Sequence, residues 1–462
     1  MTLSPQAMID SGLCIGCGAC VSFRGTADAR IGWNGDGQLQ PSGDPDWLES
    51  PAPSFARLCP FSPTAANEDA IAAARFPHAP HSDPAIGRHH AAYVGHVSEG
   101  DWRAQGSSGG MVSWVAAELL RRGLVDGVAH VAPIEPGENG FFAYRISGTE
   151  TALRAGAQSR YHPVTLAAVL DEIRATPGRY AIIGIPCFIK AVHLARAADP
   201  WLRRRIVHTL GLVCGHMKSR HMIDSFAWQM GLPGAQPVRA IDYRVKNPDR
   251  PANWYRARLT LREGGEWQQD WWHLVDGDWV LGFFQNPACD WCDDVVAETA
   301  DISFGDAWVE PYASDGRGAN VVVVRDPALH RLIEDARAAG RLALDPVDAA
   351  FVAETQAAGI RHRREGLAYR LTWRKRGVRP VKRVAPSCGG LPLRRRLVYR
   401  TRWLIARASP RLFRLARAAG RPALFLVPAR ALLTLYQALT YSRGRLGQWF
   451  DRIEARYRRD AA

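Results

Sequence analysis

Apolar and polar positions between residues 88 and 340 follow two alternating periods. From Met111 to Arg122 the apolar residues recur at helical spacing, which predicts a helix. Gly123 would end this helix, and residues 125–131 then have the apolar pattern of a strand. The residues that share one face of the helix are Val112, Val115, Ala116, Leu119 and Leu120.

The same alternation continues towards residue 340. It predicts strands at 180–185, 205–213, 300–304 and 320–324, and helices at 165–176, 188–198, 219–230 and 327–340. Strands that alternate with helices of about ten residues favour an α/β fold, in which helices flank a largely parallel sheet. Residues 238–284 differ, because Trp and Tyr alternate there with polar residues, and we predict a meander or hairpin beside the sheet.

Both ends of the chain lack this pattern. Residues 1–75 are short segments punctuated by Gly and Pro, typical of a small module held by metal rather than by a core. After residue 344 arginine becomes frequent, and helical segments are predicted at 391–408 and 412–419. The most apolar stretch, 423–441, contains Pro428 and Arg430, so it falls short of a clean membrane span. We therefore predict four parts, at residues 1–80, 85–345 (the α/β domain), 346–390 (a linker) and 391–462 (a basic helical tail).

The positive charge is concentrated near the C-terminus. The 462 residues have a formal net charge of +14, yet residues 361–462 hold 27 Lys or Arg against 4 Asp or Glu, and residues 1–360 hold 32 against 41. The acidic body makes nucleic acid an unlikely partner. The basic tail fits an anionic membrane surface or an acidic protein such as ferredoxin, and a solvated helical extension is the alternative.

The cysteines indicate metal rather than disulfides. No charged start followed by an apolar run opens the chain, so we expect a cytoplasmic protein, peripheral at the inner face of the membrane if the tail binds lipid. Nine cysteines in a reducing compartment are better explained by metal binding. Eight of them form two sets of four, and Cys388 is left over.

The first set contains a triplet at Cys-x2-Cys-x2-Cys spacing. A triplet completed by a Cys-Pro, here Cys59-Pro60, is the usual pattern of iron–sulfur ligation. A structural zinc site is the alternative, although it usually comes as two separated Cys-x2-Cys pairs. Arg24 stands where a compact ferredoxin motif would place its fourth cysteine, which leaves the assignment of Cys59 open. The first set is Cys14, Cys17, Cys20 and Cys59.

The second set is united by predicted structure rather than by spacing. Cys187 and Cys214 follow the carboxyl ends of two predicted strands, where open α/β sheets bind their ligands. Cys289 and Cys292 form a close pair on a predicted loop. Two buried structural thiols and a separate redox or zinc pair are the alternative.

These residues belong to a longer series of motifs between Gly12 and Gly340. The motifs are Gly-Leu-Cys-x2-Cys-x2-Cys at 12–20, Ser-Gly-Gly at 108–110, Gly-Leu-Val-Asp-Gly-Val at 123–128, Ser-Arg-Tyr at 159–161, Gly-Ile-Pro-Cys at 184–187, Gly-Leu-Val-Cys-Gly at 211–215, Tyr-Arg-Val-Lys at 243–246, Cys-x2-Cys at 289–292 and Ala-Asp-Ile-Ser-Phe-Gly-Asp-Ala-Trp at 300–308. In this series the chain resembles the beta-subunit family of coenzyme F-420 hydrogenases and dehydrogenases, whose relatives include ferredoxin-dependent chlorophyll-pathway reductases.

The resemblance implies FAD bound by the α/β domain and a 4Fe-4S cluster on the second set. It also implies, as in many members, further cluster binding in a ferredoxin-like module at residues 1–80, so we expect two 4Fe-4S clusters. Three features depart from the family. The N-terminal motif is incomplete, the usual Gly-Thr-Pro-Cys-Gln is Gly-Ile-Pro-Cys-Phe at 184–188, and the basic tail has no counterpart.

The motifs also supply candidate cofactor contacts. The Gly-rich loop before residue 111 suits a pyrophosphate, since N–H groups at a helix start attract anions, and a plain helix cap is the alternative. Arg244 and Lys246 suit flavin phosphates or an anionic substrate, unless they lie on a solvated strand edge. Asp306 would orient the flavin or carry protons, or else cap a turn. The cofactor candidates are Ser108, Gly109, Gly110, Ser159, Arg160, Tyr161, Gly184, Pro186, Arg244, Lys246, Gly305 and Asp306, with Asp306 and Lys246 also as catalytic residues.

Taken together, these features predict a flavin- and iron–sulfur-dependent oxidoreductase. Electrons, from ferredoxin or another low-potential donor, would pass through the clusters to FAD and on to an organic substrate. The alternatives are hydride exchange with the deazaflavin coenzyme F-420, an electron-transfer subunit of a larger complex, and a zinc-stabilised module that binds nucleic acid. No residue identifies the organic substrate.

Overall fold

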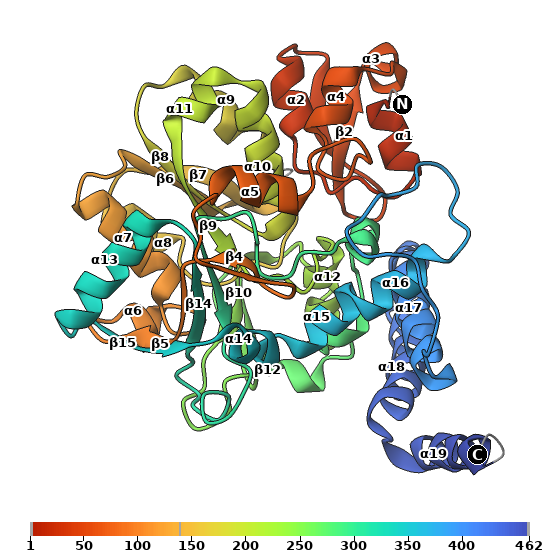
Figure 1. Ribbon diagram of the computed structural model, residues 1–462. Helices are drawn as coiled ribbons and strands as arrows, with labels where there is room; N and C mark the ends of the chain where they lie inside the picture. The colour runs from red at the N-terminus through yellow and green to blue at the C-terminus, as the bar shows by residue number, and fades with distance from the viewer. Residues whose placement is uncertain (1–2, 138–139, 460–462) are drawn as a thin grey trace.

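The computed structural model describes residues 3–137 and 140–459, and an eight-stranded mixed sheet lies at its centre (Figure 1). Across the sheet the strands are β15 (Leu342–Val347), β5 (Ala91–Val97), β14 (Asn320–Val324), β13 (Ile302–Asp306), β9 (Ile206–Leu212), β8 (Tyr180–Gly184), β6 (Gly127–Gly137) and β7 (Gly140–Ser147).

The four inner strands β13, β9, β8 and β6 pair in parallel. The outer strands pair antiparallel. The connections explain the difference, because β8 and β9 are joined through helices, whereas β6 runs directly into β7, and parallel neighbours need a longer crossover. The predicted α/β fold is confirmed, with the parallel pairing restricted to the inner strands.

Helices cover both faces of the sheet, and successive strand residues point to opposite faces. On β8, Ile182 packs with α9 and α10, and its neighbours Ala181 and Ile183 pack with α7 and α13. These helices agree with the predicted ones to within a few residues. Their bounds, with those of the shorter helices nearby, are α6 (Trp102–Gln105), α7 (Met111–Arg121), α8 (Glu150–Ala155), α9 (Ala167–Ala175), α10 (Pro186–Ala198), α11 (Pro200–Arg205), α12 (His221–Gln229) and α13 (Pro327–Ala338).

The N-terminal part consists of short elements and packs against α9 and α10. Cys14 and Cys17 lie between its first two helices, Cys20 lies in the second helix, and Cys59 directly follows the fourth. The elements are α1 (Pro5–Asp10), α2 (Ala19–Arg24), α3 (Pro45–Glu49), α4 (Pro53–Leu58), α5 (Glu68–Arg75), the antiparallel pair β1 (Ala29–Trp33) and β2 (Leu39–Gly43), and the pair β3 (His81–Asp83) and β4 (Gly87–His89).

The predicted meander is a separate antiparallel sheet, followed by short 3-10 helices. Tyr243 and Leu259 of this sheet are buried with Phe226 of α12, which fixes the meander to the body. The elements are β10 (Val238–Val245), β11 (Arg256–Leu261), β12 (Glu266–Asp270), η1 (Trp271–His273), η2 (Trp279–Leu281) and η3 (Pro287–Trp291).

Residues 346–390, predicted as a linker, include three helices packed on the body. Arg363 and Arg370 in this stretch are almost completely buried, at 2% and 0% exposure. These arginines made the second and third of the helices hard to predict, because apolar periodicity takes arginine as a surface residue. The helices are α14 (Ala349–Thr355), α15 (Ala357–Arg363) and α16 (Glu365–Leu371).

The stretch after α16 fastens the N-terminal part to the body. Lys375 Nζ donates to the Ser11 carbonyl at 2.6 Å, and the Val378 N–H donates to Ser11 Oγ at 2.7 Å. Arg383 then forms ion pairs with Asp69 at 2.8 Å and with Glu298 at 2.7 Å. This segment is therefore a strap between the N-terminal part and the α/β domain.

The tail forms three helices, α17 (Leu393–Ala418), α18 (Ala423–Tyr441) and α19 (Gly444–Arg459). The two predicted segments at 391–408 and 412–419 are one helix that continues through Pro410. Phe413 and Phe425 pack on Phe284 of the body. In the described part of the chain, α18 alone is long and apolar enough to span a membrane, with a mean hydropathy of 1.4 and 28% of that window buried. In Figure 1, α17 and α18 lie side by side and α19 turns away from the body.

Candidate functional site

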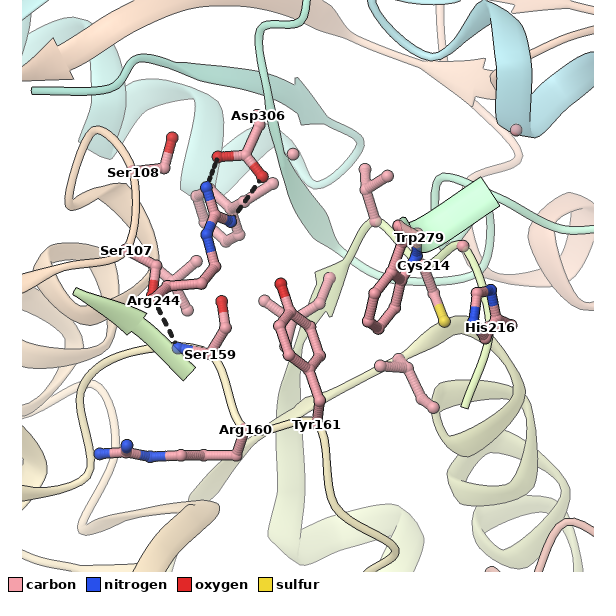
Figure 2. Close-up of a pocket in the computed structure, with 18 of the residues that line it drawn as sticks. Ser107, Ser108, Ser159, Arg160, Tyr161, Cys214, His216, Arg244, Trp279 and Asp306 are labelled. Carbon is pink, nitrogen blue, oxygen red and sulfur yellow. Dashed lines mark hydrogen bonds and ion pairs between the residues drawn. The ribbon is translucent and has the colours of Figure 1, made fainter. Parts of the chain in front are cut away.

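The carboxyl ends of β8, β9 and β13 open into a cavity of about 820 Å³, within the usual range for ligand sites. Figure 2 shows the side chains around it. Most of the predicted cofactor residues line this cavity, although they come from widely separated motifs. They are Ser108, Gly110, Ser159, Arg160, Tyr161, Gly184, Arg244, Gly305 and Asp306.

The Gly-rich loop at 106–110 is held tightly before α7. Gly110 has φ +84°, and a Cβ there would lie 2.6 Å from the Trp102 carbonyl oxygen. A Cβ on Gly109 would lie 2.7 Å from the Gly95 carbonyl oxygen. Ser108 Oγ donates to the Ala319 carbonyl at 2.8 Å. The glycines are thus required by the protein packing beneath the loop, and this packing presents the start of α7 to the cavity.

The neighbouring loop at 157–161 is strained and joined to the Gly-rich loop. The Ser159 N–H donates to Ser107 Oγ at 2.7 Å (Figure 2). Gln158 has φ +84°, an uncommon value for a residue with a side chain, and its buried Oε1 has no hydrogen-bond partner among the described residues. Strained residues with unpaired polar atoms tend to occur at ligand sites, and Gln158 lines the cavity.

Arg244 and Asp306 form a bidentate ion pair on the cavity wall, with N–O distances of 2.9 and 3.1 Å (Figure 2). Burial is the largest influence and lowers the pKa of Arg244, but Asp306 together with Tyr161 and Tyr255 raises the pKa above its usual value. The Arg244 guanidinium also lies over the Tyr255 ring, 4.6 Å from its centroid. Because Asp306 neutralises most of the charge, any anion at this wall would be bound by the pair and not by a lone cation.

Arg160 and Tyr161 are adjacent in sequence but differ in role. Arg160 donates to Asp242 at 3.3 Å and to the Ala157 carbonyl at 2.8 Å, and it points away from the Arg244 pair in Figure 2. It therefore braces its loop. Tyr161 lies inside the cavity, with its ring 4.4 Å from that of Trp279, and burial raises the pKa of its hydroxyl.

Three predicted residues, Gly109, Pro186 and Lys246, do not line the cavity. Pro186 is the first residue of α10. Lys246 Nζ donates to the carbonyls of Ser108, at 2.7 Å, and Arg103. Burial, followed by the charges of Arg244 and Arg103, lowers the pKa of Lys246 to about 7. Its place beneath the Gly-rich loop makes it a positioning residue and removes the reason for giving it a catalytic role.

The opposite wall carries Cys214 together with His216, Lys218 and Trp279. Trp279 lies between Tyr161 and His216, and its ring is 4.5 Å from the His216 ring. Lys218 is buried over the Trp279 ring at 4.8 Å and donates to the Phe283 carbonyl at 2.7 Å. No motif predicts the position of Trp279, because a 3-10 helix far along the chain brings it here.

The first cysteine set surrounds one small pocket in the N-terminal part, and Cys59 belongs to it. Gly16 and Gly18 have positive φ, and a Cβ on Gly16 would collide with the Leu39 carbonyl. Burial raises the pKa of all four thiols, that of Cys14 to about 12. Buried thiols of this kind become thiolates only with a positive partner, such as a bound metal.

The second set converges from three places in the chain. Burial raises the pKa of each of its thiols, and the electrostatic influence on Cys187 comes from the other three and also from Cys17 of the first set. Cys17, Cys289 and Cys292 share one buried apolar cluster. The two sets are therefore neighbours. Among the described residues, no three His, Cys, Asp or Glu side chains form a site for a single metal ion.

Comparison with protein families gives two matches. The N-terminal model of the coenzyme F-420 hydrogenase/dehydrogenase beta subunit matches residues 92–171, and the C-terminal model of the same beta subunit matches residues 178–350. Together they span more than half of the chain. The chain belongs to this beta-subunit family. Members are subunits of hydrogenases and dehydrogenases, so this family member is an electron-transferring oxidoreductase.

Solved structures and curated proteins add little to the family match. One similar structure is a chain of the F-420-reducing NiFe hydrogenase complex from Methanosarcina barkeri, studied as a xenon derivative. It has 15% sequence identity and a TM-score of 0.47, over 63% of this chain and 94% of that chain. No curated protein matches the sequence.

The matches to the beta-subunit family leave both ends of the chain outside. The first cysteine set precedes residue 92, and α15, α16 and the tail follow residue 350. Residues 354–359, His362 and Arg402 from this C-terminal part nevertheless line the cavity. The complete site of this family member therefore includes residues that the family pattern would not reveal.

Proposed function

We propose that the chain is a flavin- and iron–sulfur-dependent oxidoreductase that passes electrons from ferredoxin or another low-potential donor to an organic substrate. The two cysteine sets would each hold a 4Fe-4S cluster, and the cavity would hold FAD. Bound FAD supplies the conversion between one-electron carriers and two-electron hydride chemistry. The observation that carries the proposal is that Cys214 of the second set lies on the wall of the cavity lined by the flavin motifs.

The cavity residues suit a dinucleotide flavin. Val112 and Ser113 in the first turn of α7 line the cavity, although the Met111 N–H already donates to Asn320 Oδ1 at 3.1 Å, and Gln158 offers an unpaired acceptor in the same cavity. The Arg244–Asp306 pair presents guanidinium and carboxylate together on the wall. Aromatic side chains at Tyr161 and Trp279 exclude water and offer apolar faces to a flat ring. Asp306, held by Arg244, would accept a hydrogen bond from the flavin or the substrate.

Cluster binding is supported by the arrangement of the thiols. The first set lines a single pocket, and positive-φ glycines at 16 and 18 let the backbone turn tightly around it. Four thiols around one small space is what iron–sulfur ligation requires. The neighbouring positions of Cys17 and Cys187 would give a route from the first set through the second to the cavity.

A second candidate activity is hydride exchange with coenzyme F-420, which the family description favours. In that case the deazaflavin would occupy the substrate part of the cavity. A role as an electron-transfer subunit without its own substrate is a third. The zinc-stabilised nucleic-acid module loses support, because the basic tail packs on the body and the cysteines converge beside a large cavity.

The test is anaerobic purification followed by analysis of the cofactors. We expect a brown protein with iron, acid-labile sulfide and releasable FAD, whose visible absorbance bleaches on reduction. The rates at which the protein oxidises reduced ferredoxin and reduced F-420 are then compared, and this comparison separates the first two candidate activities. A colourless protein that contains only zinc overturns the proposal.

We also propose that the tail attaches the protein to an anionic membrane surface at the inner face of the cytoplasmic membrane. Residues 391–462 contain 17 Arg against 3 Asp or Glu. Large apolar side chains are exposed on all three tail helices, which an acidic protein partner alone would not require. Basic helices with exposed apolar residues bind anionic bilayers through charge attraction to the lipid headgroups and through burial of the apolar side chains. The exposed residues are Leu393, Leu404, Leu415, Leu424, Val427, Tyr441, Leu446 and Trp449.

The double substitution Leu424→Asp with Val427→Asp tests this attachment. Because burying each apolar side chain in lipid contributes about 1.5–3 kcal/mol, we expect at least about tenfold weaker co-sedimentation with phosphatidylglycerol vesicles. Leu124→Asp, at an exposed apolar position outside the tail, is the matched control. Equal binding of variant and wild type, or binding to an acidic ferredoxin but not to vesicles, contradicts the proposal.

A further inference from the structure

Arg363 is a buried cation beside the second cysteine set. It is the last residue of α15, with 2% of its surface exposed, and it lies beyond the part of the chain that the family models match. The sequence predicted a linker at this position. An arginine carried so far into the interior needs a compensating negative charge or a complete set of hydrogen bonds.

The guanidinium bridges the two loops that carry the cysteines. It donates to the carbonyls of Cys214 and Cys289, each at 3.4 Å, and to the carbonyl of Gly215. Its Nε has no hydrogen-bond partner among the described residues. Carbonyl oxygens carry only partial charge, so these contacts satisfy part of the hydrogen bonding and leave the positive charge uncompensated.

Within residues 3–137 and 140–459, Arg363 forms no ion pair with a carboxylate, whereas the nearby Lys382 pairs with Asp293 at 3.3 Å. Burial is the largest influence on Arg363 and lowers its pKa, but the thiols of Cys292, Cys214, Cys289 and Cys187 together raise the pKa above its usual value. In return Arg363 lowers the pKa of three of those thiols against the effect of burial. The missing counter-charge therefore lies on the side of the cysteines.

A 4Fe-4S cluster with four thiolate ligands is an anion, and it gains one further negative charge on reduction. Cluster potentials depend on nearby charge, hydrogen bonds and burial. A fixed guanidinium stabilises the reduced form more than the oxidised form, and weak screening in the interior strengthens this difference. In the first set, the cation that lowers the pKa of a thiol, that of Cys59, is Lys190, and Lys190 is paired with Glu68 at 3.2 Å. In the described part of the chain the first set therefore lacks an equivalent of Arg363.

We propose that Arg363 compensates the charge of the second cluster and raises its reduction potential above that of the first, so that electrons move from the N-terminal part towards the cavity. This inference rests on the proposed function, because it needs both clusters. It makes α15 part of the redox centre, as a positioning element outside the family pattern.

The experiment is a redox titration, followed by EPR, of anaerobically purified full-length protein. Arg363→Gln removes the charge and keeps hydrogen-bond donors, and we expect one midpoint potential to move to more negative values while the other stays. Arg363→Lys keeps the charge and should restore most of the shift. Arg325→Gln is the matched control, since Arg325 is equally buried but donates to the Ala300 and Ile86 carbonyls and to Ser303 Oγ, and it should leave both potentials unchanged.

The outcomes separate this inference from the proposed function. A wild-type protein without iron and sulfide overturns the proposed function itself. Wild-type iron content in Arg363→Gln with both potentials unchanged overturns the role of Arg363 alone. If Arg363→Gln does not fold, the titration of the wild type still tests the inference. The cluster that remains in Cys292→Ser is the first one, and the inference requires it to have the lower of the two wild-type potentials.

Discussion

Replacing Cys292 with serine is expected to remove about half of the iron and acid-labile sulfide from the anaerobically purified protein, since one of two 4Fe-4S clusters would lose a ligand. Serine is nearly the same size as cysteine, so the buried η3 loop around Cys292 should keep its fold. FAD should remain bound, because Cys292 does not line the cavity. Iron, sulfide and FAD analyses on one preparation measure all three quantities.

Cys388→Ser is the matched control for this substitution. Cys388 is exposed and belongs to neither set, so its replacement should leave the iron and sulfide contents unchanged. Wild-type iron and sulfide in Cys292→Ser, or an equal loss in both variants, would contradict the assignment of the second set to one cluster.

Gly110→Ala is expected to abolish FAD binding. A non-glycine residue at φ +84° costs about 1–2 kcal/mol, and here the added Cβ would also press on the Trp102 carbonyl oxygen at 2.6 Å. The loop would have to move away from α6, which would displace the start of α7 from the cavity wall. Fluorescence of FAD released by denaturation, measured per chain, should fall to near zero.

Gly231 offers a control with the same backbone conformation. Its φ is +82°, but no atom lies within 4 Å of the position of an added Cβ. Gly231→Ala should therefore lower the thermal stability by the backbone cost alone and leave FAD content unchanged. If both variants retain FAD equally, the Gly-rich loop does not form the flavin site.

The sequence predicts the central part of this molecule well, because its elements carry simple periodic patterns. The inner strands and covering helices appear at the predicted places, and Cys214, after one strand end, acts electrostatically on Cys187, after the next. The motif residues Ser108, Tyr161, Arg244 and Asp306 all reach one cavity. Strand-end positions are predictable from topology alone, since parallel strands bring their carboxyl ends to one edge.

What the sequence could not predict depends on tertiary contacts between distant segments. Lysine often binds anions, yet the Lys246 ammonium already donates to two backbone carbonyls. Arg363 and Trp279 belong to no motif, and only packing brings them to the cysteines and the cavity. Periodicity treats every arginine as exposed, so the buried arginines of α15 and α16 made these helices look like a linker.

The strap formed by Lys375, Val378 and Arg383 has a consequence for how fast electrons could travel. Because it ties Ser11 and Asp69 to the α/β domain, hydrogen bonds to Ser11 and the ion pairs of Arg383 hold the two cysteine sets at a fixed spacing. Electron tunnelling between clusters bound there would then occur over a fixed distance, and its rate would not depend on solvent viscosity. A fragment that ends at residue 350, where the family match ends, would lack the strap. Its first cysteine set would then be held less firmly against the α/β domain.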